Sequence, residues 1–307
     1  MDVSVIIVNF RTPQLVLDCV DSIFRYTKDV TFEIIVVDNN SGDNSASILS
    51  SDLRFKYVQS PNNVGFGGAN NLGYKYSTGK YIFLLNPDTI LLNNAIKIFF
   101  DEMEMLPMNV SCIGCRLLDK ERNIIKSIGI WQEFSKKECL KLAFLSYFPA
   151  IKNKYIEKAK NNYGLLNKNV PFIPVDIIIG ADMFIRNSVI KKCGLFDPRF
   201  FMYSEESDMQ KTFKKNGYIS GIIQGPQIVH LEGKSAPSSK RILMSTSGMF
   251  VYQKKWSNPF SYSIYRFMFF ILRFPLTILN RKRNVKYKLE YLKLLLQPAK
   301  NRTDFHL

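Results

Sequence analysis

Three short apolar runs within the first ninety residues each end in a cluster of polar residues. Amphipathic helical patterns at residues 14–26 and 43–49 follow the first and the second run. Alternating strands and helices predict a parallel sheet with right-handed crossovers, and such sheets bind ligands at the carboxyl ends of their strands. The runs and their polar ends are residues 3–8 with Asn9, 32–37 with Asp38-Asn39-Asn40-Ser41, and 81–85 with Asn86-Pro87-Asp88.

The third run contains no polar residue, which is typical of a strand that is buried on both faces. Pro87 ends the strand because it has no N–H to donate. Asp88 then offers a hard carboxylate oxygen to Mg²⁺ or Mn²⁺, and such an ion is often shared with substrate phosphates. The alternative interpretation is an ordinary turn that leads into a helix before Asn93.

A glycine-rich segment, residues 62–71, links the second and third runs. Its sequence NNVGFGGANN is neither a Walker loop nor a GxGxxG fingerprint. Glycines at these positions would allow the backbone to approach a ligand closely. The same composition also fits a flexible turn that opens the next helix.

Four segments in this order, VSVIIVNF, IIVVDNNSGDNS, NVGFGGANN and LLNPDT, resemble the family 2 glycosyltransferases, particularly the bacterial rhamnosyltransferase-like members. The resemblance covers about residues 1–235 and implies the GT-A fold, a Rossmann-like α/β fold with a mostly parallel central sheet and flanking helices. It implies that Asp38 contacts the pyrimidine nucleoside of a nucleoside-diphosphate sugar, with Asn9 beside the base. We expect the donor site to comprise Asn9, Asp38, Asn40, Gly67, Asn70, Asn86 and Asp88.

The metal motif of the GT-A fold is Asp-x-Asp, and this chain has Asn86 in its first position. Asp88 would therefore be the only carboxylate ligand from that motif. The resemblance also implies that His230, in a final short strand at residues 228–231, completes the metal site. Without that context, a lone histidine is more often a structural hydrogen-bonding residue.

An acidic cluster, Glu205, Glu206 and Asp208, follows the aromatic segment FFMY. Carboxylates are favoured in the first turn of any helix, here residues 205–215, so the cluster by itself can be purely structural. The resemblance places the catalytic base at Glu206, where the family usually has Asp. The longer side chain leaves Glu205 as the alternative base, and Asp208 is expected to hold the helix and its preceding loop.

The formal net charge of +16 is unevenly distributed, because residues 240–307 contain 14 Lys and Arg against Glu290 and Asp304. A nucleic-acid-binding protein would interleave its basic residues with exposed aromatic residues, whereas the aromatic residues here form an apolar block. We therefore expect no nucleic-acid partner.

The five cysteines are odd in number, and Cys112 and Cys115 fit a buried strand. No signal peptide pattern opens the sequence. We therefore expect a reducing cytoplasmic location.

The apolar block at residues 262–279 is interrupted by Arg266, Arg273 and Pro275, which leaves no uncharged run long enough to span a bilayer. The two arginines are seven residues apart on one helical face, amid Phe and Leu. This pattern predicts a helix lying in the interface of an anionic membrane, with inserted residues Phe267, Phe269, Phe270 and Leu272. The alternative is an amphipathic helix packed on the protein core.

We therefore expect a GT-A domain at residues 1–239 and a basic helical region at residues 240–307. The GT-A domain would comprise a nucleotide-sugar-binding half, 1–105, and an acceptor and catalytic half, 106–239, with a basic insert at 132–169. The predicted activity is inverting, Mg²⁺- or Mn²⁺-dependent transfer of rhamnose from dTDP-rhamnose, or of another sugar from a dTDP- or UDP-sugar. The acceptor would be a saccharide or a lipid-linked saccharide for O-antigen or capsule synthesis, on the cytoplasmic face of the inner membrane. The alternative is a catalytically idle membrane-associated scaffold on the same fold, since Asn86 and Glu206 both depart from the commonest motifs.

Overall fold

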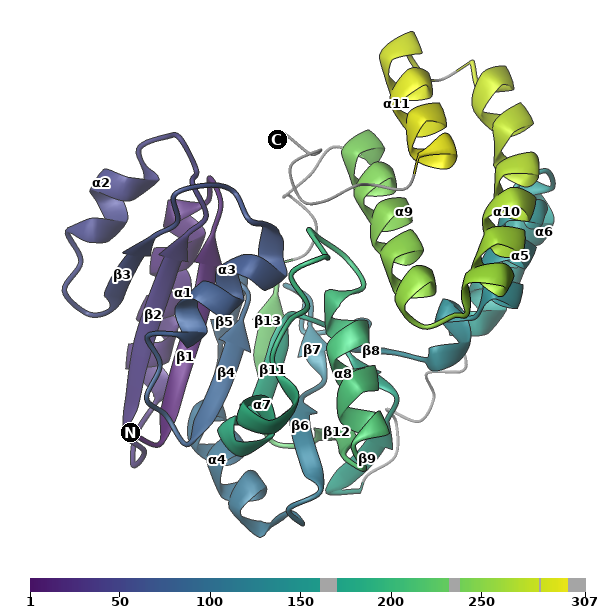
Figure 1. The fold of residues 1–307 in the computed structure, drawn as a ribbon. Helices are drawn as coiled ribbons and strands as arrows, with labels where there is room; N and C mark the ends of the chain where they lie inside the picture. Colours follow the sequence, from purple (N-terminus) through teal and green to yellow (C-terminus); the bar gives the residue numbers. More distant parts are fainter. Residues whose placement is uncertain (161–169, 232–237, 282, 298–307) are drawn as a thin grey trace. The chain divides into compact units, whose positions relative to one another are not determined.

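The computed structural model describes residues 1–160, 170–231, 238–281 and 283–297 (Figure 1). The chain divides into two compact units. The sheet unit consists of Met1–Gly129, Asn169–Phe201 and Glu205–Lys234. The helical unit consists of Ile130–Lys168, Met202–Ser204 and Ser235–Leu307.

The sheet unit is built on an eight-stranded mixed sheet of order β3-β2-β1-β4-β11-β6-β12-β9. The first four strands in this order are parallel, as are β6 and β12, whereas β11 and β9 run antiparallel to their neighbours. The sheet is therefore mostly parallel, as the strand and helix alternation predicts. Its strands are β1 (Val3–Asn9), β2 (Phe32–Asp38), β3 (Lys56–Gln59), β4 (Tyr81–Leu85), β6 (Val110–Gly114), β9 (Phe172–Val175), β11 (Asp182–Arg186) and β12 (Ile219–Ile223).

Two smaller sheets complete the strands of this unit. β13 (Ile228–His230) lies between β5 (Thr89–Leu91) and β7 (Leu117–Leu118), and β8 (Ile128–Gly129) pairs with β10 (Ile177–Ile178). The helices are α1 (Pro13–Tyr26), α2 (Ser45–Ser50), α3 (Gly65–Tyr74), α4 (Ala95–Met105), α7 (Asn187–Cys193) and α8 (Glu205–Lys215).

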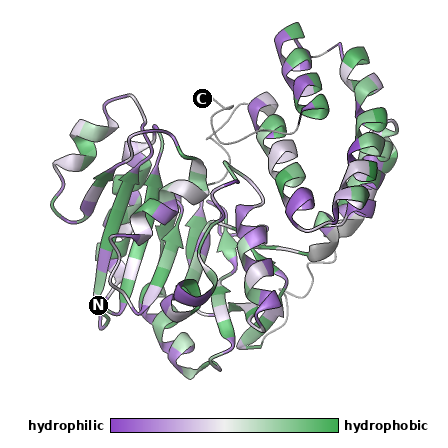
Figure 2. Cartoon of the chain, in the orientation of Figure 1, coloured by the Kyte–Doolittle hydropathy of each residue, from purple (hydrophilic) through white to green (hydrophobic). Residues whose placement is uncertain are grey.

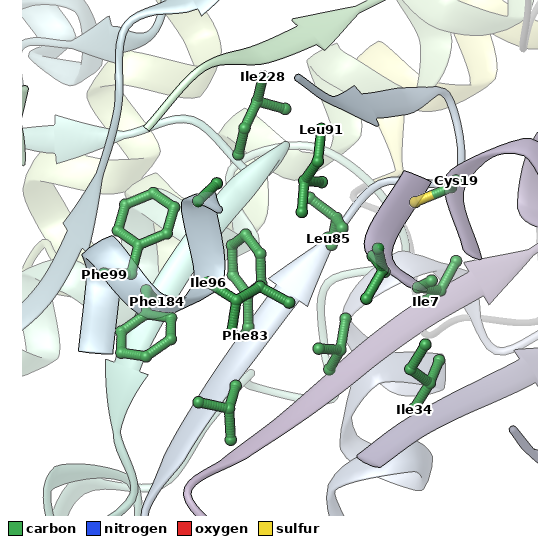
Figure 3. Packing of buried hydrophobic residues seen from close by; sticks show 14 of the residues in the cluster. Ile7, Cys19, Ile34, Phe83, Leu85, Leu91, Ile96, Phe99, Phe184 and Ile228 are labelled. Atoms are coloured by element: carbon green, nitrogen blue, oxygen red, sulfur yellow. The ribbon is translucent and has the colours of Figure 1, made fainter. Parts of the chain in front are cut away.

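Helices cover both faces of the large sheet. Successive side chains of a strand point to opposite faces, and here the side chains on both faces are apolar, so both faces must be buried. Phe83 and Leu85 belong to the same core cluster as the buried residues of α1 and α4 (Figure 3). The opposite face carries Ile6 and Val37, against which Gly73 of α3 packs so closely that a Cβ there would lie 2.6 Å from Ile6 Cγ2. The sheet is thus buried on both faces, which explains why its central strands contain almost no polar residues.

The predicted strands and helices of the first half are confirmed with small shifts at their ends. Asn9 is the last residue of β1 and Asp38 is the last residue of β2, and the two are register partners.

Cys112 lies in a fully buried strand, as expected, and all five cysteines are free thiols. The glycine-rich segment opens helix α3 at Gly65, as its alternative interpretation predicts. Pro87 and Asp88 form a turn, but the short strand β5 follows it, and the next helix begins only at Ala95.

The helical unit has its own apolar core, formed mainly by its three C-terminal helices and α5. Tyr265 and Phe269 of α10 pack with Phe250 of α9 and with Tyr291 of α11 in this core. Figure 2 shows mainly hydrophobic residues along α10. The elements are the 3-10 helix η1 (Trp131–Phe134), α5 (Lys136–Leu145), α6 (Pro149–Lys160), α9 (Ser238–Lys255), α10 (Pro259–Leu279) and α11 (Val285–Leu296).

The structure corrects the predicted orientation of α10. Arg266 donates a hydrogen bond to the Leu294 carbonyl oxygen at 3.2 Å, and Arg273 donates one to Tyr291 Oη at 3.1 Å, so both arginines face the unit's interior. Of the four residues predicted to insert into a membrane, Phe269 is buried, Phe270 and Leu272 pack against the core, and only Phe267 is exposed. The two arginines do lie on one face of α10, but that face points into the helical unit and not toward a membrane. Guanidinium groups can donate to the free carbonyl oxygens at the end of a neighbouring helix, and the sequence pattern does not distinguish this from contact with lipid.

Candidate active site

Asp38 is the centre of a hydrogen-bond network at the carboxyl ends of β1 and β2. Asn9 Nδ2 donates to Asp38 Oδ1 at 2.7 Å and to Ser41 Oγ at 3.1 Å, and the Ser41 hydroxyl also donates to Asp38 Oδ1. Asn9 Oδ1 accepts from the Thr12 N–H at 3.1 Å. Asn9 is fully buried and thus holds the Asp38 carboxylate in a fixed orientation.

Sequence reasoning missed two residues that complete this edge of the sheet. Gln59, the last residue of β3, donates from Nε2 to Asp38 Oδ2 at 3.0 Å, while its own side chain is exposed. Asn39 joins the β2 end to the glycine-rich segment, because its Oδ1 accepts from the Val64 N–H at 2.9 Å. Parallel register could have indicated Gln59, since it is the register partner of Asp38. Asn40 follows with φ of +58° and an exposed side chain.

The glycine-rich start of α3 packs against the protein rather than lining an open surface. A Cβ on Gly67 would lie 2.9 Å from Phe196 Cβ, so glycine is needed there for packing. Asn70 is buried, and its Nδ2 donates to the Phe66 carbonyl oxygen at 3.1 Å. The structure therefore gives Gly67 and Asn70 packing roles, and their predicted contact with a donor stays a prediction.

Asp88, just before β5, and His230, the last residue of β13, lie beside each other at one end of the small sheet. Asp88 Oδ1 lies 3.3 Å from His230 Nε2, and both side chains are mostly buried. His230 pairs in register with Thr89, and the Leu231 N–H donates to the Asp88 carbonyl oxygen at 2.9 Å, which fixes the two chains beside each other. Asn86 precedes this turn, and its N–H donates to the Ala181 carbonyl oxygen at 3.0 Å. The family resemblance pairs these two residues, which are 142 positions apart, and the structure places their side chains beside each other. Their binding of a metal ion stays a prediction.

The donor set at this pair fits a divalent cation that also has ligands from a substrate. One carboxylate oxygen and one imidazole nitrogen suit Mg²⁺ or Mn²⁺ only as part of a larger shell. Within the described ranges, no group of three or more His, Cys, Asp or Glu side chains lies close enough to hold a metal ion. The remaining ligands would therefore be diphosphate oxygens and water.

The two glutamates at the start of α8 have different surroundings. Glu205 is 3% exposed, and its Oε2 has no hydrogen-bond partner in the described part of the chain. Burial, together with the neighbouring charge of Glu206, raises the pKa of Glu205 well above its usual value. Burial also raises the pKa of Glu206, but a backbone hydrogen bond and the nearby Lys126 ammonium oppose that increase, and Glu206 is only half-buried. Asp208, one turn further along, is buried.

A further buried acid, Asp182, was not singled out from the sequence. It begins β11, and its Oδ2 accepts from the Cys115 N–H at 2.7 Å, whereas Oδ1 has no hydrogen-bond partner among the described residues. Burial raises the pKa of Asp182 to about 7, although hydrogen bonds from Cys115 and the charge of His230 act in the opposite direction. No periodicity in the segment IIIGADMFIR distinguishes such a buried acid from an exposed one.

The open mixed sheet, with acidic and amide side chains at the carboxyl ends of β1, β2 and β4, is a GT-A fold, because the solved structures that it resembles are GT-A glycosyltransferases. The chain is similar in structure to a mannosyltransferase from Pyrobaculum calidifontis solved in complex with GDP-Man and Mn²⁺, with a TM-score of 0.53 and 14% identity over 94% of this chain and 77% of that one. It is similarly related to residues 1–349 of Staphylococcus aureus TarS in complex with UDP-GlcNAc, with a TM-score of 0.53 and 13% identity over 95% of this chain and 78% of that one.

The family model for glycosyl transferase family 2 matches residues 4–193. The chain belongs to this family and is a glycosyltransferase. One relative is the low-salt glycan biosynthesis hexosyltransferase Agl10 of Haloferax volcanii, 26% identical over 75% of this chain and 67% of that protein. Another is the GalNAc(5)-diNAcBac-PP-undecaprenol β-1,3-glucosyltransferase of Campylobacter jejuni, 30% identical over 52% of this chain and 54% of that protein. The match to glycosyltransferase GlyG of Streptococcus pneumoniae spans only 35% of that protein.

Proposed function

We propose that this glycosyltransferase is an inverting, metal-dependent enzyme that transfers a sugar from a nucleoside diphosphate to a saccharide acceptor. The observation that carries the proposal is the Asp88 and His230 pair, with 3.3 Å between Oδ1 and Nε2 at the end of β4. Direct displacement at the anomeric carbon needs a cation on the leaving diphosphate, a base for the acceptor hydroxyl, and a fixed orientation of both reactants.

Asp38 is proposed to recognise the base of a pyrimidine nucleotide. Its carboxylate is fixed by Asn9 and Ser41, while the exposed Gln59 amide occupies Oδ2 and can be replaced by a ring N–H of the ligand. Uracil and thymine both offer such a donor, which supports UDP- or dTDP-sugars. Rhamnose from dTDP-rhamnose is the specific donor that the sequence resemblance favours, with Asn40 and Asn86 close to the same sheet edge.

Asp88 and His230 would hold Mg²⁺ or Mn²⁺, which supplies positive charge to the leaving diphosphate when it is bound. The Pyrobaculum calidifontis mannosyltransferase, which has a similar fold, was solved in complex with GDP-Man and Mn²⁺, and this supports the assignment. Asn86 in place of a second carboxylate leaves the site with one negative charge fewer, so we expect metal binding to depend strongly on the nucleotide.

Glu206 is proposed as the base that accepts the proton of the acceptor hydroxyl. A base must be ionised before the reaction, and the two glutamates compete for one proton because they are adjacent. Glu205 is more buried and has an unpartnered oxygen, so it is the better site for that proton. Glu206 is more exposed and has Lys126 nearby, so it is the better of the two sites for the negative charge.

The acceptor is proposed to be a lipid-linked saccharide in the synthesis of a bacterial surface polysaccharide such as O-antigen or capsule. The Campylobacter jejuni relative acts, by its name, on an undecaprenol-diphosphate-linked saccharide. We propose that the GT-A domain extends over residues 1–239, with an insert at 132–169, and that residues 240–307 associate with the cytoplasmic face of the membrane. The insert and the C-terminal region share a single compact unit, which supports a common role for them.

Thermal shift with dTDP- and UDP-sugars, each measured with and without Mn²⁺, tests the donor and the metal together. We expect stabilisation by at least one pyrimidine nucleotide and an increase when Mn²⁺ is present. Slow hydrolysis of that donor without acceptor would separate an enzyme from a catalytically idle scaffold. Nucleotide binding with no hydrolysis and no transfer to any saccharide acceptor would favour the scaffold.

A further inference from the structure

The outward face of α10 is a continuous apolar stripe. With 3.6 residues per turn, positions three, four and seven apart lie on one side of a helix. Seven large apolar residues of α10 follow this spacing and are exposed, with Phe267 at 66% exposure. They are Phe260, Ile264, Phe267, Met268, Ile271, Phe274 and Ile278.

The inward face of the same helix is firmly held by the helical unit. Tyr265 and Phe269 are buried in its core, and Arg266 lies over the Phe250 ring with its guanidinium carbon 3.8 Å from the ring centroid. Arg273 Nη1 also donates to Ser146 Oγ at 3.2 Å. These contacts would be lost, and two charged side chains would be placed in hydrocarbon, if α10 left the unit to cross a bilayer.

By length and composition alone, α10 is the one helix in the described part of the chain that could cross a membrane, and only 17% of its most apolar window is buried. The core helix of a soluble protein passes the same test when it is mostly buried. α10 fits neither description, because one of its faces is packed and the other is open. Such a helix suits an interface between water and lipid.

Further exposed apolar residues, in and between α5 and α6, belong to a segment that lies beside α10. Tyr147, just after α5, donates from Oη to the carbonyl oxygen of Leu272 in α10 at 2.8 Å, so the two elements are side by side. Phe144 and Phe148 are both exposed, and their ring centroids are 5.7 Å apart. Ile151 in α6 is also exposed.

The protein's net positive charge belongs entirely to the helical unit. This unit contains 22 Lys and Arg against 5 Asp and Glu, whereas the sheet unit contains 20 against 21. Exposed basic residues stand at both ends of α10, with Lys254 before it and Arg281 after it. Charge of this sign complements an anionic lipid surface and opposes the approach of a second copy of the same unit.

We propose that the helical unit docks on an anionic lipid bilayer through the outward face of α10, which lies in the membrane interface without crossing it. Phe267 and Ile271 are central to the inserted stripe, and the exposed residues Phe144, Phe148 and Ile151 extend it. Arg266 and Arg273 maintain the helix on its unit and do not contact lipid. This inference deepens the membrane location in the proposed function but is independent of the donor, the metal and the base.

Sedimentation of the full chain with phosphatidylcholine vesicles, with and without phosphatidylglycerol, tests the proposal. We expect binding that requires phosphatidylglycerol, weakens in high salt and is not abolished there, because salt screens the charges but not the inserted side chains. The double variant Phe267→Ser and Ile271→Ser should bind about tenfold more weakly and lose the salt-resistant fraction. The control variant Leu53→Ser and Met108→Ser removes exposed apolar residues of the sheet unit and should bind like the wild type.

Three other results would overturn the proposal. Equal binding of the two double variants would show that α10 is not the docking face. Resistance of the bound protein to extraction by alkaline carbonate would show that α10 crosses the bilayer. A dimer in gel filtration that dissociates in the Phe267 and Ile271 variant, without vesicle binding, would identify the stripe as a contact between copies. Nucleotide thermal shifts of each variant show whether the sheet unit remains intact, so failure here is distinguishable from failure of the proposed activity.

Discussion

The Phe66 N–H donates a hydrogen bond to the Phe201 carbonyl oxygen at 3.0 Å, which joins the glycine-rich start of α3 to the segment before the acidic helix α8. Gly65 makes this contact possible, because a Cβ there would lie 1.8 Å from the same carbonyl oxygen. This backbone hydrogen bond therefore connects the segment proposed to bind the donor with the segment that carries the proposed catalytic base. Only four residues separate Phe201 from Glu206, so a shift of this carbonyl is expected to move the base.

Gly65→Ala should lower both stability and turnover. The substitution places an L side chain at φ of +73°, which costs about 1–2 kcal/mol, and it forces Phe201 to move. Gly217→Ala is the matched control, since Gly217 has φ of +84° and no atom within 4 Å of an added Cβ. We expect both variants to lose melting temperature from backbone strain, Gly65→Ala more because of its overlap with Phe201, and a lower kcat only for Gly65→Ala. Equal kcat in the two variants would show that the Phe66 and Phe201 contact does not position the base.

Glu206→Gln should keep donor affinity while losing about 10² to 10⁴ in transfer rate, the usual contribution of a general base. Glu205→Gln should keep most of the activity, because a protonated Glu205 and a glutamine carry the same charge. Because burial raises the pKa of Glu206, the acid limb of kcat/KM should lie above the ordinary carboxylate range and should disappear in Glu206→Gln. If Glu205→Gln is the inactive variant, the two roles are exchanged.

Asp88→Ala should abolish turnover and remove the Mn²⁺-dependent part of the thermal shift with nucleotide, since one carboxylate oxygen is lost from a site with few protein ligands. His230→Ala should weaken the same metal effect less than Asp88→Ala does, because it removes a neutral ligand. Asp101→Ala, an exposed acid of α4 paired with Lys97, is the control and should respond to Mn²⁺ like the wild type. Full activity of Asp88→Ala in excess EDTA would refute the metal assignment.

The strands were predictable from the sequence because a doubly covered sheet requires continuous apolar runs, and the end of each run marks the ligand edge. Asn9, Asp38 and Asp88 were found in this way, and Glu206 and His230 required the family resemblance. Gln59 was missed because it ends a half-exposed strand with no continuous apolar run. The direction of Arg266 and Arg273 was missed because helical spacing identifies a face but does not identify what covers it.

Asp182→Asn should stabilise the protein at alkaline pH while changing little near pH 4. Burial raises the pKa of Asp182 to about 7 in the folded protein, whereas an unfolded aspartate titrates near the usual value of about 3.9. The folded state therefore holds a proton that the unfolded state releases, so stability is fully present below about pH 3.9 and falls as pH rises to about 7. The total loss is on the order of 4 kcal/mol above that range, from about 1.36 kcal/mol per pKa unit. Asparagine carries no charge, and its amide oxygen can still accept from the Cys115 N–H.

Denaturant unfolding of the wild type and Asp182→Asn between pH 4 and pH 9 measures this difference. Asp52→Asn is the opposing control, because hydrogen bonds from Arg54 lower the pKa of Asp52. That carboxylate stabilises the fold above its unfolded pKa, and its contribution is lost as the pH falls, so Asp52→Asn should be less stable than the wild type at neutral pH. Parallel pH profiles for the wild type and Asp182→Asn would mean that Asp182 is ionised in the folded protein. Its unpartnered Oδ1 would then require a positively charged neighbour, and a bound cation near His230 would become the first candidate to examine.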